Sequence, residues 1–365
     1  MSWLYVFLGF CFLIVIHEAG HFLAAKAVGM RVERFFLFFG PTIWSFSRGE
    51  TEYGVKAIPI GGYVKITGMN PEEEVPPEHE ENAYFRKPVW KRIVVVAAGP
   101  AVNIALAFLI LFGVYWSSGK PEVGRSVEKV EPQTPAAKVL HPHDRILAID
   151  GHSGRGKDST ERSKEFSEIV KSHKCASPKV DGCVSETPVV LQFEHAGQIR
   201  TVHVFPRYDK ELGFMRIGFS YGVNRVPVDA SGAAAEAGRA IREVGAGTLH
   251  VITHLFESRQ RKQVSGVVGI SDVGHQVVEK SFEKALLLLA LVSLSLGLIN
   301  LLPILPLDGG HIFWALVEKL RRGKPVSLRV IERATVIGFA LVVVLMFIGL
   351  SNDIGRITGE GFNVR

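Results

Sequence analysis

The sequence predicts an α-helical membrane protein with four transmembrane spans and one hydrophilic α+β domain outside the cytoplasm. Three observations predict this class: four apolar segments of about 20 residues, the length that crosses a bilayer; basic residues gathered in the loops; and a hydrophilic, strand-rich segment between the second and third apolar segments. The chain has 365 residues, of which 47% are hydrophobic and 21% charged. A mean hydropathy of +0.21 is high for a wholly soluble chain. Disordered, collagen-like and disulfide-stapled classes are excluded.

The first apolar segment differs from the other three because it contains His17, Glu18 and His21. The expected spans are Trp3 to about Val28, Ile93–Trp116, Ala285–Ile304 and Ala334–Leu350. A cleaved signal peptide is the alternative for the first segment. We favour a span because no Lys or Arg precedes the apolar run, and because two histidines and a glutamate are foreign to signal peptides.

The loop charges predict the orientation in the cell (inner, cytoplasmic) membrane. Short cytoplasmic loops are enriched in Lys and Arg, and here basic residues gather between spans one and two and between spans three and four. These residues are Arg31, Arg34, Arg48, Lys56, Lys65, Arg86, Lys87, Lys91, Arg92, Lys319, Arg321, Arg322, Lys324, Arg329 and Arg333. Both termini and residues 117–284 are therefore expected outside the cytoplasm. There Cys175 and Cys183 either form a disulfide or remain thiols. The net charge of +6 is not concentrated in one dense block, so we expect no nucleic acid partner.

Two histidines in the first span are spaced for metal binding. His17-Glu18-Ala19-Gly20-His21 matches the pattern H-E-x-x-H. Helical residues four apart project from one face, so the two imidazoles can bind one Zn2+ ion. Glu18 then lies beside the metal, where it can act as general base toward a metal-bound water. The alternative is a polar face packed against other spans, but ionisable groups inside a span are costly and by default functional.

A catalytic zinc needs a third protein ligand, and Asp308 is the best candidate. It follows Pro303 and Pro306 in an apolar run. Prolines break a helix at membrane depth only where the freed backbone is buried in protein or lines a wet cavity. Gly309 and Gly310 permit close approach of the backbone to metal or substrate. The alternative, Asp308 as the N-cap of the next helix, accounts for Asp308 but not for the prolines.

Together these motifs resemble those of the site-2 proteases, intramembrane zinc metalloproteases that cleave transmembrane segments. The resemblance rests on H-E-x-x-H, on N-x-x-P-x-x-P-L-D-G over 300–309, and on residues 98–103 and 61–65. It implies a Zn2+ cofactor held by His17, His21 and Asp308, with Glu18 as the catalytic base. It also implies that Asn300 helps to hold the substrate or the developing oxyanion.

Residues 52–66 alternate partially between apolar and polar side chains about a Pro-Ile-Gly-Gly turn, which predicts a β-hairpin. A free edge of this hairpin can accept an unwound substrate as an added strand. We therefore expect Gly61, Gly62 and Tyr63 to bind substrate, and the family resemblance suggests that the loop dips into the membrane beside the active site. The alternative is a cytoplasmic hairpin with no substrate role.

The hydrophilic segment 117–207 predicts a PDZ-like α+β domain. Its expected strands are 127–130, 145–149, 188–193 and 201–205. Residues 130–137 and 144–151 resemble PDZ domains of bacterial proteases, which implies either a groove for an extended peptide or a size filter over the active site. Two features depart from that pattern. His141 and its neighbours replace the usual glycine-containing steps, and a long polar insert occupies 152–187.

The remaining segments complete an expected order of 1–116, 117–207, 208–284, 285–350 and a tail over 351–365. Within 208–284, residues 233–256 have helical periodicity and predict an amphipathic helix at the membrane surface or against the core. Residues 265–270 resemble another block of the family but suggest no chemical role. His250 and His254 have metal spacing but no obvious third ligand, so we interpret them as surface histidines.

The expected function is cleavage of single-span membrane proteins that have already been trimmed outside the bilayer. The resemblance suggests the second cut of regulated intramembrane proteolysis, acting on an anti-sigma factor or on remnant signal peptides. A catalytically silent PDZ-type membrane scaffold is the alternative of another class, but all proposed ligands and Glu18 are present. A membrane zinc hydrolase of soluble peptides is disfavoured because His17 and His21 lie within a span.

Overall fold

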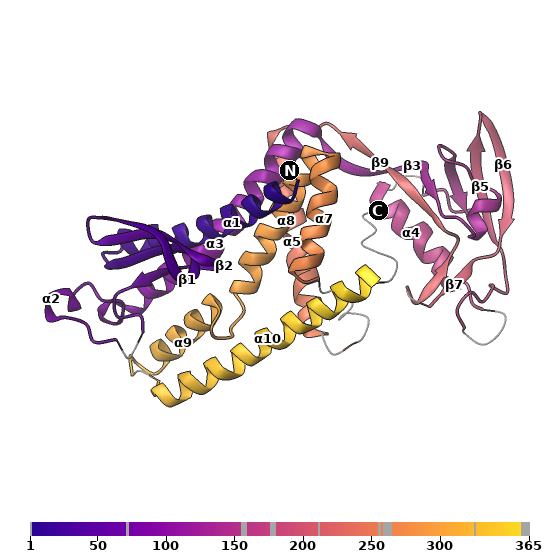
Figure 1. The fold of residues 1–365 in the computed structure, drawn as a ribbon. Helices are drawn as coiled ribbons and strands as arrows, with labels where there is room; N and C mark the ends of the chain where they lie inside the picture. The colour runs from indigo at the N-terminus through magenta and orange to yellow at the C-terminus, as the bar shows by residue number, and fades with distance from the viewer. Residues whose placement is uncertain are drawn as a thin grey trace. The chain divides into compact units, whose positions relative to one another are not determined.

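The chain forms two compact units, residues 1–114 with 230–365 and residues 115–229 (Figure 1). The computed structural model describes residues 2–70, 73–154, 159–175, 180–210, 212–254, 257, 265–324 and 326–358. We call the first the membrane unit, because within the described residues the helices long and apolar enough to cross a bilayer lie wholly or mainly in it, and the second the β unit.

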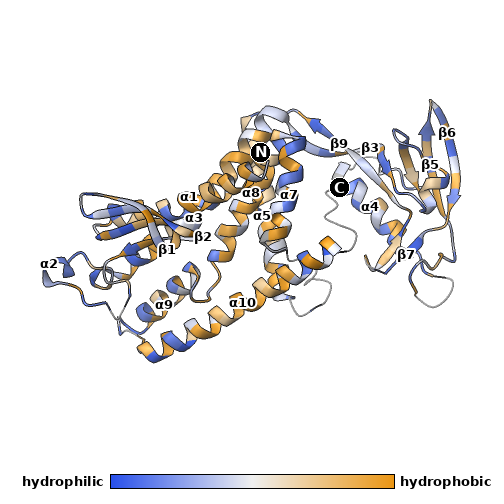
Figure 2. Ribbon diagram, viewed as in Figure 1, coloured by the Kyte–Doolittle hydropathy of each residue, from blue (hydrophilic) through white to orange (hydrophobic). Residues whose placement is uncertain are grey.

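Helices dominate the membrane unit. They are α1 (Ser2–Ala27), α2 (Pro77–Glu80), α3 (Val89–Ser118, continuing into the β unit), α5 (Ala230–Thr253), α7 (Val267–Lys280), α8 (Phe282–Asn300), α9 (Asp308–Leu320) and α10 (Leu328–Thr358), with a 3-10 turn at Tyr84–Arg86. By length and composition, α1, α3, α8 and α10 are candidate spans, and they are the long, mainly orange helices of Figure 2. Each coincides with one of the four apolar segments expected from the sequence.

The small sheet of the membrane unit consists of β1 (Val32–Arg48) and β2 (Thr51–Ile66), joined by a tight turn at Gly49. Residues 34–37 of β1 pair on both sides, with 52–55 and with 62–65 of β2. The prediction of a β-hairpin over 52–66 is therefore wrong. The two halves of this segment do not pair with each other, because β1 lies between them. The strand at 62–66 has β1 on one side, and among the described residues no further strand on the other.

This sheet is attached to the helices through a shared apolar core. Val32 and Ile66, at the sheet end that leads to the helices, are at most 3% exposed. They pack with Ala25 of α1 and with Val95 and Val96 of α3. Burial of this core holds the inner ends of β1 and β2 against the first two long helices.

The β unit is an antiparallel sheet with strand order β6-β5-β4-β3-β9. Its strands are β3 (Lys120–Val130), β4 (Arg145–Ile149), β5 (Val189–His195), β6 (Gln198–Val204) and β9 (Phe219–Val226), with a separate pair of β7 (Arg207–Asp209) and β8 (Phe214–Arg216). Helix α4 (Ser159–Ser172) contributes Phe166 and Val170 to a core shared with inward-facing residues of the strands. All four strands expected from the sequence overlap strands of this sheet.

The β unit is longer than the 117–207 segment that hydropathy indicates, because β9 returns to pair with β3 and completes the sheet. The segment 152–187 contains α4, and its two cysteines are joined. Cys175 and Cys183 form a disulfide with a Cα–Cα distance of 5.9 Å. Cys11 in α1 is a free thiol.

Residues 265–270, which suggested no chemical role, begin helix α7 against the end of α10. The carboxylate of Asp353 in α10 accepts hydrogen bonds from the backbone N–H groups of Gly266, at 3.1 Å, and Gly269, at 2.8 Å. Asp353 is fully buried. The first N–H groups of a helix lack intrahelical partners and carry partial positive charge, so a buried carboxylate satisfies them well.

Candidate metal centre

Three side chains from two distant parts of the chain converge in the membrane unit. His17 and His21 project from one face of α1, and Asp308 is the first residue of α9. The Nε2 atoms of the two histidines lie 3.3 Å apart. Asp308 Oδ2 is 3.2 Å from His17 Nε2 and 3.4 Å from His21 Nε2. His21 and Asp308 are 287 positions apart in the sequence (308 − 21), yet their side chains meet at one point in the fold.

These separations fit one tetrahedral zinc ion. Ligands at roughly 2.0–2.1 Å from Zn2+ are about 3.3–3.4 Å from each other in a tetrahedron. Asp308 Oδ2 is buried and has no well-oriented hydrogen-bond donor among the described residues. An unpaired buried carboxylate oxygen is costly. A cation bound between the three side chains would satisfy it.

His21 is oriented for ligation by its other ring nitrogen. Its Nδ1 lies 2.9 Å from the carbonyl oxygen of Val95 in α3. A carbonyl can only accept, so Nδ1 carries the proton and Nε2 presents its lone pair to the centre. Gly99 makes room for this ring, because a Cβ atom there would collide with the His21 imidazole. Gly20 similarly allows α1 to approach α3, since its Cβ would lie 2.6 Å from the Ala98 carbonyl oxygen.

Asn103 of α3 is a residue that sequence reasoning did not assign to the site. Its side-chain amide lies 3.3 Å from His17 Nδ1, and the residue is fully buried. In the structure the amide nitrogen Nδ2 faces His17 Nδ1, and Oδ1 has no hydrogen-bond partner among the described residues. A half turn of the amide exchanges the two atoms, and with Oδ1 toward His17 the amide would accept the Nδ1 proton and leave Nε2 free for the centre. A polar side chain inside an apolar span was the available signal. The sequence could not show which histidine it would meet.

The broken segment after α8 positions Asp308. Helix α9 begins at Asp308 with Leu307 as N-cap, and no side chain caps it. Asp308 therefore does not act as the N-cap, and its carboxylate faces the histidines. Gly309 and Gly310 were expected to let the backbone approach metal or substrate. In the structure they let the start of α9 pack against the backbone of residues 301–305, with which Cβ atoms at these positions would collide.

An ion pair fastens α9 to α3. Arg92 donates to both carboxylate oxygens of Glu318, at 2.6 and 3.0 Å. The side chains are only 12% and 20% exposed, and such two-pronged pairs have a defined geometry. The ring of Tyr84 lies beneath the guanidinium. Burial raises the pKa of Tyr84 to about 12, so it remains a neutral phenol.

The edge strand of the small sheet lies against Glu18. A Cβ atom at Gly62 would lie 3.0 Å from Ile14 and 3.1 Å from the Glu18 side chain. The backbone of Val64, on the same strand, also lies close to the Glu18 carboxylate. Tyr63 stacks between aromatic rings of β1, and Gly61 has a φ of 68°, where an L side chain is strained. The three residues expected to bind substrate thus lie on the strand beside Glu18.

Two other residues are less directly placed. Asn300 is the half-buried last residue of α8, and no described hydrogen bond joins its side chain to the three converging residues. His311 lies one turn beyond Asp308 and is half-buried. Within the described residues, the pair His250 and His254 has no third ligand that would complete a metal group.

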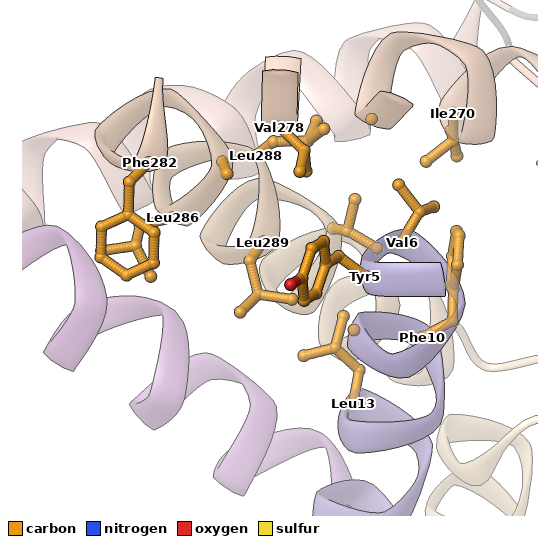
Figure 3. Close-up of a pocket in the computed structure, with 14 residues that line it drawn as sticks. Tyr5, Val6, Phe10, Leu13, Ile270, Val278, Phe282, Leu286, Leu288 and Leu289 are labelled. Atoms are coloured by element: carbon orange, nitrogen blue, oxygen red, sulfur yellow. The ribbon is translucent and has the colours of Figure 1, made fainter. Parts of the chain in front are cut away.

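A separate apolar cavity of about 480 Å³ lies between α1, α7 and α8 (Figure 3). Tyr5, Phe10 and Leu13 of α1 line it, opposite Ile270 and the apolar face of α8. Leu13 is one helical turn before His17, but neither histidine nor Asp308 lines the cavity. The cavity and the metal centre are therefore distinct places.

The chain is similar to known proteins over most of its length. The family model described as peptidase family M50 matches residues 5–345. A putative zinc metalloprotease of Rhizobium meliloti (strain 1021) is 32% identical over 370 residues, covering 95% of this chain and 94% of that protein. Zinc metalloprotease Rip1 of Mycobacterium tuberculosis (strain ATCC 25618 / H37Rv) is 29% identical over 385 residues, covering 93% and 94%.

Among solved structures, the PDZ domain of an SdrC-like protein from Listeria monocytogenes matches part of the chain. It is 24% identical and covers 27% of this chain and 86% of that domain's chain, with a TM-score of 0.21.

Proposed function

Since this chain belongs to peptidase family M50, the site-2 protease family, and is a zinc metalloendopeptidase and a multi-pass membrane protein, we propose that it hydrolyses peptide bonds within transmembrane segments. Its substrates are single-span membrane proteins already trimmed outside the bilayer. The observation that carries this proposal is the convergence, at zinc spacing, of two imidazoles on α1, a helix apolar enough to cross a membrane, with a carboxylate at the start of α9.

In this proposal His17, His21 and Asp308 hold the zinc ion and Glu18 is the base. The zinc ion supplies Lewis acidity, which activates water and polarises a carbonyl. Glu18 takes the proton from the attacking water and gives it to the leaving amine nitrogen, which requires one carboxylate near both atoms. Gly62 and Val64 of the edge strand lie beside that carboxylate. Val95 and Asn103 orient the two imidazoles.

A helical substrate hides its carbonyls in hydrogen bonds, so it must unwind before cleavage. The unpaired edge of β2 at 62–66 supports a route. An unwound segment added there as a strand would exchange internal hydrogen bonds for bonds to the sheet. Gly61, Gly62 and Tyr63 would contact it, and Gly62 lies directly over Glu18. We assign Asn300 to the holding of substrate on the strength of the family motif, without a contact to the centre.

The proposed setting is the cell membrane, with the metal centre toward the cytoplasm and both termini and the β unit outside. The basic loops between α1 and α3 and between α9 and α10 support this orientation. Release of a cytoplasmic fragment from an anti-sigma factor, and removal of remnant signal peptides, are the processes we propose. The β unit would bind an extended peptide along a strand edge or limit the size of substrates.

The decisive experiment is reconstitution in proteoliposomes with trimmed single-span substrates. Glu18→Gln keeps the shape of the side chain but removes its basicity. We expect zinc content to be retained and cleavage to fall by on the order of 10²–10⁴. Elemental analysis and product mass spectrometry measure the two quantities. Unchanged turnover in Glu18→Gln would exclude Glu18 as the base. If the parent protein cleaved none of the trimmed substrates, the catalytically silent scaffold would be favoured.

A further inference from the structure

The β unit contains a second group of metal-ligating side chains that the proposed function does not use. We call His141, Asp144 and His195 the outer cluster. His195 Nδ1 lies 2.6 Å from Asp144 Oδ1, and His141 Nδ1 lies 4.0 Å from Asp144 Oδ2. The two imidazole centroids are 5.1 Å apart. One ligand atom from each residue lies within 4.8 Å of the other two.

The strand register produces this juxtaposition. Arg145, the first residue of β4, pairs with Glu194 of β5 in the antiparallel sheet. The residues one step beyond, Asp144 and His195, therefore lie side by side at the end of the two strands. The turn before β4 then brings in His141, whose backbone N–H donates to Asp144 Oδ2 at 2.8 Å. The carboxylate is thus fixed between the two rings by the fold.

Burial and exposure differ among the three in a way that suits a metal site. The Asp144 side chain is 3% exposed, whereas those of His195 and His141 are 32% and 67% exposed. A buried carboxylate is costly without a cationic partner. The exposed imidazole of His141 can rotate toward it, and the open side leaves room for water as a further ligand.

We propose that the outer cluster binds a divalent transition metal ion, with Zn2+ as the ion that its donor set fits. Two imidazole nitrogens and one carboxylate oxygen are the same donors that meet in the membrane unit. The bound ion would join the turn before β4 to the end of β5 and so stabilise the folded β unit by mass action. This proposal rests on the β unit alone and does not depend on the proteolytic function.

The test counts zinc on the full-length protein in detergent, by equilibrium dialysis at a series of fixed free Zn2+ concentrations. We expect two equivalents in the parent protein and one in His195→Ala and in His141→Ala. Asp308→Ala should also bind one, and the double variant Asp308→Ala/His195→Ala none. His203→Ala is the matched control, since His203 is an exposed histidine on β6 of the same sheet, and it should bind two.

Each outcome decides one assignment. If His141→Ala and His195→Ala bind as much zinc as the parent at every concentration, the outer cluster is an ion-paired turn and the proposal is overturned. Equal loss in His203→Ala would show scattered binding by surface histidines and would also overturn it. Loss in His195→Ala with none in Asp308→Ala would support the outer cluster while contradicting the proposed metal centre.

A second measurement guards against a variant that simply unfolds. Asp144 is not replaced, because its carboxylate also closes the turn. Thermal unfolding of Asp308→Ala, which keeps only the outer cluster, should shift upward with added zinc. The double variant Asp308→Ala/His195→Ala should show no shift while keeping the Cys175–Cys183 disulfide as a mark of native folding. A zinc-dependent shift in the double variant equal to that of Asp308→Ala would overturn the proposal.

Discussion

At the scale of single residues, Asn103 is the polar group on which the orientation of His17 depends. Its amide is fully buried and touches His17 Nδ1, and its backbone carbonyl accepts a hydrogen bond from Ser293 at 2.9 Å. Removing a group that orients a metal ligand typically weakens metal binding by about 10–100-fold. The side chain therefore matters for the centre although it cannot reach the metal position itself.

We expect Asn103→Ala to lower zinc affinity by about 10–100-fold, and Asn103→Asp, which retains an oxygen acceptor for the Nδ1 proton, to lose less. Competition with a chelator of known affinity measures this. Ser293→Ala is the control, since it removes only the bond to the Asn103 backbone. Equal zinc affinity in Asn103→Ala and the parent would mean that His17 needs no such support.

The three proposed metal ligands differ from Asn103 in how far the sequence could identify them. His17 and His21 are recognisable because their spacing is local and helical geometry fixes their common face. Asp308 could be chosen because prolines mark the break around it. The contacts of Asn103 and of the outer cluster could not be predicted, because the partners are distant in the chain, 86 residues for Asn103 and His17 and 51 for Asp144 and His195.

At the scale of elements, the contact between α7 and α10 depends on one carboxylate. Asp353 accepts from two N–H groups at the beginning of α7, and Gly349 allows the helices to touch, since a Cβ there would lie 3.0 Å from Gly266. Loss of a buried partner leaves polar groups unsatisfied and costs about 1–3 kcal/mol. This gives the block 265–270 a structural role that neither its sequence nor its position predicted.

Asp353→Asn should lower the thermal stability of the purified protein, because an amide group would turn an N–H donor toward one of the two backbone N–H groups. A cost of about 1–3 kcal/mol is expected for the unsatisfied groups. Arg356→Ala is the matched comparison. It removes a hydrogen bond to Ser265 and an ion pair at 3.9 Å with Asp353, but it leaves both backbone N–H groups their carboxylate acceptor, so its effect should be smaller. If both variants had the same melting temperature as the parent, the stability of α7 would not depend on the Asp353 carboxylate.

The edge strand allows a second prediction at this scale, which separates substrate binding from metal binding. Gly62→Val adds three side-chain carbons, and the first of them, the Cβ, would lie only 3.1 Å from the Glu18 side chain. The strand would have to move away from α1. We expect cleavage to be lost while zinc content remains that of the parent, measured on one preparation. Gly113→Val in α3, where a Cβ meets no atom within 4 Å, is the control. Normal cleavage by Gly62→Val would exclude this edge from the substrate path.

The sheet also shows where local patterns are insufficient. The alternation over 52–66 correctly indicated extended chain, but it could not show that β1 would lie between the two halves, because strand partners are set by contacts far along the chain. Apolar span length is a local property, and all four candidate spans coincide with the expected segments. The end of the β unit was missed for the same non-local reason. Strand β9 pairs with β3 across sequence separations of 89 positions, between Val130 and Phe219, to 106 positions, between Lys120 and Val226.

At the scale of the whole molecule, the proposed topology makes the two faces of the membrane chemically different. Metal centre chemistry on the cytoplasmic side requires the loops around α2 and between α9 and α10 to remain inside. The disulfide Cys175–Cys183 requires an oxidising space, as found outside the cytoplasm. A single crossing by α3, between the first basic loop and the β unit, and a single crossing by α8, between the β unit and the α9–α10 loop, would satisfy both requirements at once.

Reporter fusions test this arrangement directly. Alkaline phosphatase, active only outside the cytoplasm, should be active when joined after Thr358 at the end of α10 or after Val226 at the end of β9. It should be inactive after Gly323 or after Asn70, because the basic loops at those positions are held inside by the charge bias of short loops. A cytoplasmic fluorescent reporter at the same four points should give the opposite pattern. Phosphatase activity after Gly323 would place the α9–α10 loop outside, separate Asp308 from the cytoplasmic face, and contradict the orientation on which substrate access is argued.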